Sequence, residues 1–320
     1  MVDDSGNKWK YLLKGNEDLR LDSRIMQLFT LINSLLQKYR FTLTHSLSVV
    51  QYSIIPFAPN VGFISWVTGS DTLQQLVVDF RQHRRIPRTL ERDISNKIIG
   101  DIYNSLTSIQ RIEIFYKIKK HTNANELREL LWLRSPTPTI WLQRNHNFTV
   151  STALMSMAGY VIGLGDRHPS NIMIQRHTGR VIHIDFGDSF EVTMSRTFFP
   201  ERVPFRMTRM IQNALDGGRV EGLFRRYCKD VMRVLRENQS SIIAQLEVFM
   251  HEPIFSERKV MNDSKKVLDR VAAKLEGLDP VEEGNENCRL RVGKQVDKLI
   301  EIAKDENLYI RHYMGWCPFW

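Results

Sequence analysis

The sequence predicts a mixed α+β fold in which a few short strands accompany a mostly helical body. Residues 48–57 and 61–67 are rich in β-branched and aromatic residues and flank a Pro-Asn turn, which is typical of paired strands. Residues 8–14 begin with alternating polar and apolar residues and predict another early strand. Residues 172–175 and 181–185 predict a second, separate pair of short β-branched strands.

Apolar residues at helical spacing fill most of the remaining chain. In the first such segment Leu19, Ile25, Phe29 and Ile32 fall on one face of a helix. The same periodicity predicts helices at 17–39, 71–83, 109–119, 123–133, 137–144, 149–162, 207–215, 220–236, 238–250 and 262–276.

Composition and charge place the chain among ordinary globular proteins. Its 320 residues suffice for one large or two ordinary domains with a packed core. The net charge of +9 indicates a surface that tolerates anions such as nucleotides, acidic partners or acidic membranes. We do not expect nucleic-acid binding, because no recognition helix or metal-finger spacing accompanies the charge.

Cysteine usage and the apolar runs predict an intracellular protein. Cys228, Cys288 and Cys317 are widely spaced and form no metal-binding pattern, which fits a reducing compartment. The opening residues lack the apolar core of a signal peptide, and the apolar run 152–164 is too short to span a bilayer. We therefore expect a soluble cytoplasmic protein, with a peripheral place on endomembranes and a nuclear pool left open.

Three polar residues near the middle of the chain carry the strongest functional signal. Asp166 and Asn171 lie five residues apart in the loop Gly-Asp-Arg-His-Pro-Ser-Asn, and Asp185 ends the second of the short strands. Phosphoryl transfer from ATP needs a group that accepts a hydroxyl proton and hard oxygen ligands for Mg²⁺. The sequence therefore predicts Asn171 and Asp185 as metal ligands and Asp166 as the base.

Each fragment alone also has an ordinary structural explanation. Asp, Asn, Ser and Gly populate turns, and Asp185-Phe186-Gly187 could simply end a strand. The two fragments together, joined by two short strands, favour kinase chemistry. In that chemistry Arg167 and His168 would offset the negative charge that develops beside the base. His183, in contrast, is expected to be an ordinary strand histidine.

The order Asp166-Arg167-His168 reverses the His-Arg-Asp of ordinary protein kinases. Together with GLGDRHPSN at 163–171 and HIDFGD at 183–188, it resembles the phosphatidylinositol 3-kinase superfamily and its protein-kinase branch, the phosphatidylinositol 3-kinase-related kinases. The ending GWCPFW at 315–320 is similar to that of the target-of-rapamycin (TOR) kinases within this branch. The resemblance extends over nearly the whole chain.

The resemblance implies a bilobal kinase-type catalytic domain that is followed by a helical C-terminal tail, the FATC domain. It divides the chain into a partial small lobe (1–67), a mostly helical large lobe with the catalytic loop and activation segment (68–276), and the FATC tail (288–320). The family's phosphate-covering glycine-rich loop lies upstream of the position of Lys14, so we expect that loop to be missing and the small lobe to be truncated. The implied cofactors are ATP and Mg²⁺, with Mn²⁺ as an alternative.

Lys14 is the expected nucleotide lysine. It closes a strand, and Glu17 and Asp22 follow in the opening turns of the next helix. That arrangement suits a cation held toward phosphates and equally a surface lysine near a capping acid. The resemblance of residues 12–22 to the family's phosphate-lysine segment selects the first interpretation. It implies that Leu12 and Lys14 belong to the nucleotide site, with Glu17 and Asp22 as the acidic associates of the lysine.

The resemblance also implies where adenine and the γ-phosphate bind. An adenine site needs an apolar slot, an aromatic face and backbone hydrogen-bonding groups. The residues implied to line it are Tyr52, Ile64, Ser65, Trp66, Val67, Thr72, Met173 and Ile184. For Tyr52 and Trp66 the residues alone favour plain core packing. Lys14 and His168 are expected to stabilise charge on the transferred phosphate.

The activation segment, 185–208, bears on the substrate. Lipid kinases of the superfamily carry basic clusters here, whereas Arg196, Arg202 and Arg206 are balanced by acidic residues in this chain. A near-neutral segment favours a protein hydroxyl as acceptor. We therefore expect a serine/threonine protein kinase of the TOR type, acting in growth and nutrient signalling. A phosphatidylinositol kinase and a catalytically weak scaffold are the alternatives.

Two further segments predict interactions. Residues 84–120 resemble the insertion on which TOR-type kinases bind a WD40-repeat subunit, and a larger TOR-type complex is implied. The basic stretch 81–97 is otherwise a solvated insertion, with nucleic-acid or lipid contact as a minor alternative. The terminal aromatic residues from Tyr309 to Trp320 either pack against the kinase lobe, which we favour, or make peripheral membrane contact.

Overall fold

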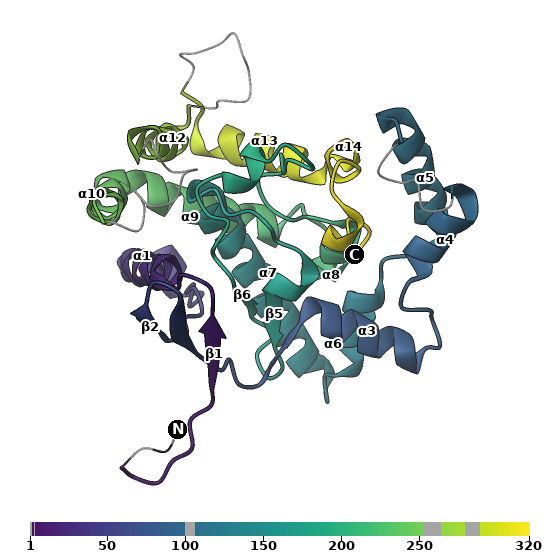
Figure 1. Cartoon of the computed structure of the whole chain (residues 1–320), viewed down its shortest axis with the longest axis horizontal. Coiled ribbons are helices and arrows are strands. Elements are labelled where there is room, and N and C mark those ends of the chain that lie inside the picture. The colour runs from purple at the N-terminus through teal and green to yellow at the C-terminus, as the bar shows by residue number, and fades with distance from the viewer. Residues whose placement is uncertain (1, 3, 100–105, 253–263, 279–288) are drawn as a thin grey trace.

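The computed structural model describes residues 2, 4–99, 106–252, 264–278 and 289–320. It contains two small antiparallel sheets and a large body of helices, which confirms the mixed, mostly helical fold. In Figure 1 the first sheet lies at the lower left beside the N-terminus, and the second lies deep among the helices. The division into two lobes that the sequence predicts stays a prediction.

The first sheet contains β1 (Tyr11–Gly15), β2 (Ile54–Ala58) and β3 (Val61–Ser65) in the order β1-β3-β2. The predicted hairpin of β2 and β3 is present, but β2 begins at Ile54 rather than at residue 48. The Asn33 side chain explains the difference, because its Nδ2 donates to the Val49 carbonyl oxygen at 3.0 Å and its Oδ1 accepts from the Val49 N–H at 2.7 Å. A helix side chain thus takes the place of a strand partner.

Helix α1 (Arg20–Gln37) joins this sheet to the helical body. It contacts β2 on one side and helices α9 (Leu223–Glu237) and α10 (Gln239–Met250) on the other. Its apolar face, which includes Leu21, Ile25 and Phe29, is fully buried. The short helix α2 (Arg40–Leu43) follows it.

The second sheet contains β4 (Ser70–Thr72), β5 (Ile172–Gln175) and β6 (Val181–His183). The hairpin of β5 and β6 is the predicted one. Strand β4, from far upstream in the sequence, was not predicted. Its three residues are too few to show the alternation that indicates a strand. Its pairing sets Thr72 opposite Met173. Because β6 ends at His183, Ile184 and Asp185 lie beyond the strand, contrary to the prediction.

Most of the remaining helices agree broadly with the predicted segments, but α4 (Leu90–Ile99) lies where no helix is predicted. The remaining helices are α3 (Leu73–His83), α4, α5 (Ser108–His121), α6 (Glu126–Leu133), α7 (Pro138–Val161), α8 (Arg209–Ala214), α12 (Ser264–Glu276), α13 (Val292–Lys304) and α14 (Glu306–Tyr309). Helix α7 is continuous where the sequence predicts a break after residue 144. Within the predicted gap, Asn145 has a tertiary partner, because its side chain donates to the Ala214 carbonyl oxygen at 2.7 Å.

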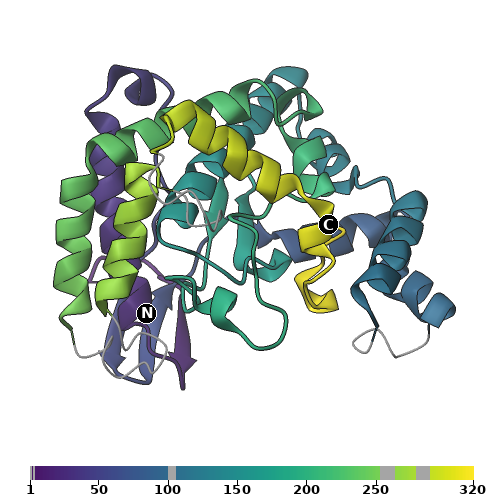
Figure 2. The same cartoon turned by 90° about the horizontal axis from the view of Figure 1, so that it is seen from above.

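The C-terminal tail packs along the large lobe. Helix α13 lies against α9, and the chain then returns toward the catalytic loop, as the yellow ribbon in Figure 2 shows. The side chains of Tyr309, Trp316, Phe319 and Trp320 are at most 5% exposed. The aromatic cluster therefore packs against the body of the molecule, the alternative that the sequence favours. Within the described ranges, no helix is long and apolar enough to cross a bilayer.

Candidate active site

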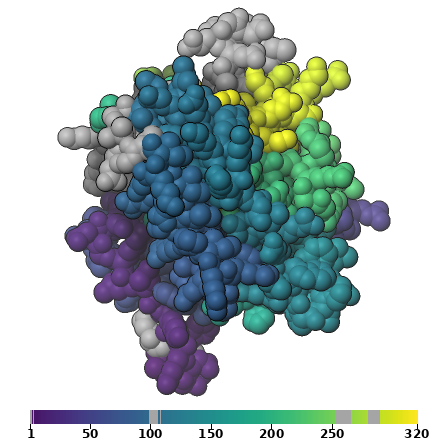
Figure 3. Space-filling model, turned by 90° about the vertical axis from the view of Figure 1, so that its right-hand side faces the viewer, coloured from purple at the N-terminus to yellow at the C-terminus, as the bar shows by residue number. Residues whose placement is uncertain are grey.

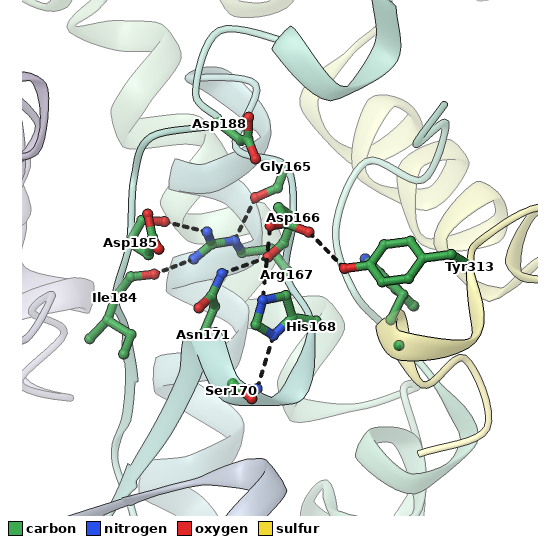
Figure 4. Close-up of polar contacts among 12 residues, drawn as sticks. Gly165, Asp166, Arg167, His168, Ser170, Asn171, Ile184, Asp185, Asp188 and Tyr313 are labelled. Atoms are coloured by element: carbon green, nitrogen blue, oxygen red, sulfur yellow. Dashed lines mark hydrogen bonds and ion pairs between the residues drawn. The ribbon is translucent and has the colours of Figure 1, made fainter. Parts of the chain in front are cut away.

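The loop that carries Asp166 is held in place by close packing and by side-chain hydrogen bonds to its backbone (Figure 4). At Gly165 the loop lies so close to Thr193 that any Cβ would overlap the threonine side chain. Asp166 then adopts a left-handed backbone conformation, with φ of 55°. This conformation is uncommon for residues other than glycine and often marks constrained functional sites. The Asn171 side chain donates through Nδ2 to the Asp166 carbonyl oxygen at 3.0 Å, so the predicted base and the predicted ligand are directly linked.

Arg167 lies behind this loop and does not face the place where phosphates are expected. Its buried guanidinium donates to the carbonyl oxygens of Gly165 at 2.7 Å, Ile184 at 2.8 Å and Asp185. Burial lowers the pKa of Arg167, although the carboxylates of Asp185 and Asp166 oppose that shift. The expectation that Arg167 offsets charge beside the base is therefore replaced by a structural role. It clamps the catalytic loop to the start of the activation segment.

His168 turns one ring nitrogen into the loop and the other toward Asp166. Its Nδ1 accepts the backbone N–H of Ser170 at 3.2 Å, and its Nε2 lies 3.9 Å from Asp166 Oδ2. Burial lowers the pKa of His168, which outweighs the opposing effect of the Asp166 carboxylate. A neutral imidazole that accepts at Nδ1 carries its proton on Nε2. The proton-bearing nitrogen is thus the one that faces Asp166.

Lys14, on the first sheet, lies beside Asp185, which follows the second sheet. Asp185 has a left-handed backbone with φ of 60°, and its carboxylate is 45% exposed. Lys14 Nζ lies 3.7 Å from Asp185 Oδ2 and forms a closer ion pair with Glu17. Partial burial lowers the pKa of Lys14, but the hydrogen bond to Glu17 and the charge of Asp185 outweigh it, and the pKa is raised. Lys14 therefore remains a cation beside the predicted metal ligand.

Asp22 reaches the same region from helix α1. Its side chain is buried, and its Oδ1 accepts a hydrogen bond from the Phe186 backbone N–H at 3.0 Å. Its charge also contributes to the raised pKa of Lys14. Asp22 is thus an electrostatic associate of the lysine, as expected, and in addition a direct support of the Asp185-Phe186-Gly187 turn.

Asn171 and Asp185 fit a magnesium ion. Because the Asn171 amide nitrogen donates to the Asp166 carbonyl oxygen, Oδ1 is the side-chain atom left to bind a metal. Hard oxygen ligands of this kind, completed by waters and phosphate oxygens, suit Mg²⁺. In the described part of the chain there is no cluster of three or more His, Cys, Asp or Glu side chains, which would instead indicate an all-protein metal cage.

The predicted adenine residues lie on both sheets. Leu12 and Ile64 are cross-strand neighbours on the first sheet, and Thr72 and Met173 are neighbours on the second. Ser65 ends β3, and Trp66 and Val67 follow it, with the Trp66 ring 54% exposed. Thr72 also caps helix α3, because its hydroxyl accepts the Gln75 N–H at 3.1 Å.

The remaining two members of this set lie nearer the catalytic loop. Ile184 donates its backbone N–H to the Asn171 carbonyl oxygen at 3.1 Å. Tyr52 approaches the Asp185 backbone with its hydroxyl, and its pKa is raised, by burial first and then by the charge of Asp22. Tyr52 therefore belongs to the support of Asp185, whatever its relation to adenine.

Sequence reasoning missed two residues that contact Asp166. Glu201 Oε2 accepts the Asp166 backbone N–H at 2.8 Å, and the Tyr313 hydroxyl donates to Asp166 Oδ1 at 3.3 Å. Burial raises the pKa of Glu201 to about 7, although the N–H of Asp166 opposes the shift. These residues lie 35 and 147 positions from Asp166, so no local spacing could have indicated them.

Comparison with known proteins gives two family matches. Residues 8–258 match the phosphatidylinositol 3- and 4-kinase family, and residues 289–320 match the FATC domain. The chain is 39% identical over 360 residues to the serine/threonine-protein kinase TOR2 of Saccharomyces cerevisiae, an alignment that covers 98% of the chain and 14% of TOR2. It is 37% identical over 377 residues to the serine/threonine-protein kinase mTor of Drosophila melanogaster, covering 99% of the chain and 15% of that relative.

Solved structures give a similar result. The FAT and kinase domain of CtTel1 superimposes with a TM-score of 0.84 at 28% sequence identity. That match covers 100% of the chain and 22% of the CtTel1 structure. The chain thus spans only a small part of the relatives that it matches, and that part contains their catalytic fold.

Proposed function

Because the chain belongs to the phosphatidylinositol 3- and 4-kinase family, we propose that it is the catalytic part of a TOR-type serine/threonine protein kinase. Its partition into a partial small lobe, a large lobe and a FATC tail is part of this proposal. The observation that carries it is the joint arrangement of Asp166, Asn171, Asp185 and Lys14. A hydrogen bond links Asn171 to Asp166, and Lys14 Nζ lies 3.7 Å from Asp185 Oδ2.

The geometry supports the following roles for these residues. Asp166 would accept the proton of the acceptor hydroxyl as that oxygen attacks the γ-phosphorus of ATP. Asn171 Oδ1 and the Asp185 carboxylate would hold Mg²⁺, which neutralises charge on the phosphate oxygens when it is bound. Lys14 lies beside Asp185 and would attract the same phosphates. His168 would present its Nε2 proton on the Asp166 side of the site, where charge develops.

The activation segment supports a protein acceptor rather than a phosphoinositide. Arg196 is paired with Asp188 at 2.6 Å, and Arg206 is buried against carbonyl oxygens of the C-terminal tail. Of the three arginines in this segment, Arg202 is the exposed one. An inositol phosphate head group needs several free cations, and the described segment offers a poor set for that purpose.

We also propose that helices α4 and α5 bind a WD40-repeat partner within a larger complex. They project from the right-hand side of Figure 1 and lie on the face that Figure 3 presents. Ile109 is 71% exposed and Tyr116 is 45% exposed on α5, so apolar side chains are available there for a partner. A cytoplasmic location remains part of the proposal. Membrane contact through the aromatic tail is no longer part of the proposal, because the rings of Tyr309, Trp316, Phe319 and Trp320 are buried.

The direct test is phosphate transfer by the longest native protein that contains this chain. Labelled MgATP is offered with a mixed Ser/Thr peptide pool and with phosphatidylinositol vesicles side by side. The Asp185→Ala variant serves as the control. Peptide labelling that disappears in Asp185→Ala supports the protein-kinase proposal and the metal role together.

Two other results would redirect the proposal. Vesicle labelling in place of peptide labelling would assign the chain to lipid substrates. Tight binding of a WD40 partner without transfer to either acceptor would make a scaffold the better account.

A further inference from the structure

Tyr313 connects the C-terminal tail to the catalytic loop. Its hydroxyl donates to Asp166 Oδ1 at 3.3 Å, and Figure 4 shows the ring reaching across from the tail toward the carboxylate. On the other side of the same carboxylate, His168 Nε2 lies 3.9 Å from Oδ2. The two carboxylate oxygens of Asp166 thus face two different groups, one on the tail and one within the loop.

We propose that Tyr313 is a positioning residue for the proposed phosphoryl transfer, and that it fixes the rotation of the Asp166 carboxylate. With Oδ1 engaged by the tyrosine, Oδ2 is the atom left to accept the proton of the substrate hydroxyl. That O–H bond breaks as the new O–P bond forms, and ADP departs with the electron pair of the broken P–O bond. The inference rests on the proposed function, because it assigns Asp166 the role of base.

The ring of Tyr313 is held firmly enough for this role. Gly315 leaves room for it, since a Cβ there would approach the tyrosine ring within 2.7 Å. Phe199 of the activation segment packs edge-on against it, with the ring centroids 6.3 Å apart. Burial and then the charge of Asp166 raise the pKa of Tyr313, so the phenol stays protonated and remains a donor.

Arg206 anchors the tail just after this contact. Its buried guanidinium donates to the carbonyl oxygens of Trp316 at 2.7 Å, Cys317 at 2.7 Å and Trp320 at 2.9 Å. It also donates to the carbonyl oxygen of Arg167, the residue after the base, at 3.3 Å. The tail and the catalytic loop therefore share one cation, which keeps the distance from Tyr313 to Asp166 short.

The same hydrogen bond could also inhibit the reaction instead of positioning the base. The Tyr313 hydroxyl donates to Asp166 as a substrate hydroxyl would, so it could compete with the substrate. The engagement of Oδ1 alone and the tyrosine's fixed ring favour positioning over competition. Positioning predicts that kcat falls when the Tyr313 hydroxyl is removed, whereas competition predicts that kcat rises, so kinetics can distinguish the two.

The test replaces the tyrosine and follows the kinetics of the longest native protein that contains this chain. We expect Tyr313→Phe to lower kcat about 3- to 30-fold, with little change in KM for MgATP or peptide, because only the orientation of the base is lost. Replacement of Tyr313 by 4-aminophenylalanine, which keeps a donor at the same place, should restore most of kcat. A merely structural tyrosine would not show this rescue. An unchanged or raised kcat in Tyr313→Phe would overturn the inference.

Tyr309→Phe is the matched control. Tyr309 lies in the same tail, and its hydroxyl accepts the Met207 N–H at 2.8 Å and donates to the Ala303 carbonyl oxygen at 2.5 Å, so it contacts no part of the catalytic loop. Its loss should lower thermal stability, and the kcat of the protein that remains folded should change less than in Tyr313→Phe. An equal loss of kcat in both variants would indicate general loosening of the tail.

A second measurement does not depend on turnover. Coupling between two sites is reciprocal, so removing the carboxylate should loosen the tail. We expect Asp166→Ala to raise amide hydrogen exchange in residues 310–316 to the same extent as Tyr313→Phe. Unchanged exchange in Asp166→Ala would overturn the inference even if the wild-type protein transferred no phosphate. Absence of transfer by the wild type, with increased exchange in both variants, would count against the proposed function alone.

Discussion

The Oδ1 atom of Asp22 accepts the backbone N–H of Phe186 at 3.0 Å, across 164 residues of sequence. This hydrogen bond joins the first long helix of the small lobe to the turn that presents Asp185. The carboxylate is buried, so it binds the amide without competition from water. The position of the proposed metal ligand therefore depends on a helix that does not itself line the catalytic loop.

Asp22→Ala should destabilise the protein by about 1–3 kcal/mol, because it leaves a buried N–H without its acceptor. It should also raise KM for MgATP, since the Asp185 turn loses its support. Asp22→Asn is the matched variant, because its amide oxygen can still accept the Phe186 N–H. Urea unfolding and steady-state kinetics measure the two effects. Equal losses in both variants would mean that the charge of Asp22 matters more than the hydrogen bond.

Asn171→Ala should raise the Mg²⁺ concentration needed for half-maximal transfer about tenfold or more, and lower kcat. Its amide is both a proposed ligand and the donor to the Asp166 carbonyl oxygen. A Mg²⁺ titration at saturating ATP and peptide separates the ligand role from the hydrogen-bonding role. Excess Mg²⁺ should restore only the loss of activity that is due to weaker metal binding. An unchanged Mg²⁺ requirement would contradict the ligand role.

Arg206→Lys should cost about 2–4 kcal/mol of folding stability, since a lysine ammonium cannot reach the three tail carbonyls that the guanidinium bridges. Limited proteolysis should then cleave the tail faster. The control is Arg219→Lys at an exposed position, where a change within about 0.5 kcal/mol is expected. If the tail of the Arg206→Lys variant resisted proteolysis as well as the wild-type tail does, that result would contradict the anchoring role.

Glu201 should make stability fall as pH rises toward neutral. Burial raises its pKa from 4.5 to about 7 in the folded protein. Between these values the folded state keeps a proton that the unfolded chain has lost, so folding is favoured at low pH. This contribution is lost as pH rises through 7, on the order of 3 kcal/mol in all.

The comparison of wild type with Glu201→Gln isolates this effect. A glutamine can still accept the Asp166 N–H and does not titrate, so its stability between pH 5 and 8 should fall less steeply. Glu221→Gln, at an exposed position, should retain the wild-type slope. Chemical denaturation at several pH values provides the measurement, and parallel curves for wild type and Glu201→Gln would contradict the assignment.

The sequence was most informative where function lies in short, ordered motifs. The spacing of Asp166, Asn171 and Asp185 was enough to predict a shared site, because a loop and a hairpin bring these positions together. One available signal was overlooked. Asp22 is an acid at helical spacing with Ile25, Met26 and Phe29, on the face that the helix buries. A carboxylate on an apolar face needs a buried partner, and the partner proved to be an amide of the activation segment.

Other contacts could not be predicted from local patterns. Glu201 was counted only as one of several charges in the activation segment, and Tyr313 only as one aromatic residue among several. Both depend on how the tail and the segment fold back on the catalytic loop. Similarly, the strand predicted from residue 48 starts later, because Asn33 binds the backbone of Val49. Periodicity reports the preference of a segment and gives no information about a competing side chain from another helix.

The burial of Trp320 has a practical consequence for how the protein can be handled. Its indole Nε1 donates to Glu91 Oε1 at 3.2 Å, its ring lies under the guanidinium of Arg81, and its carbonyl oxygen is bound by Arg206. An affinity tag or fluorescent protein fused after this residue would have to leave from a closed interior, and would pull the indole and its partners apart.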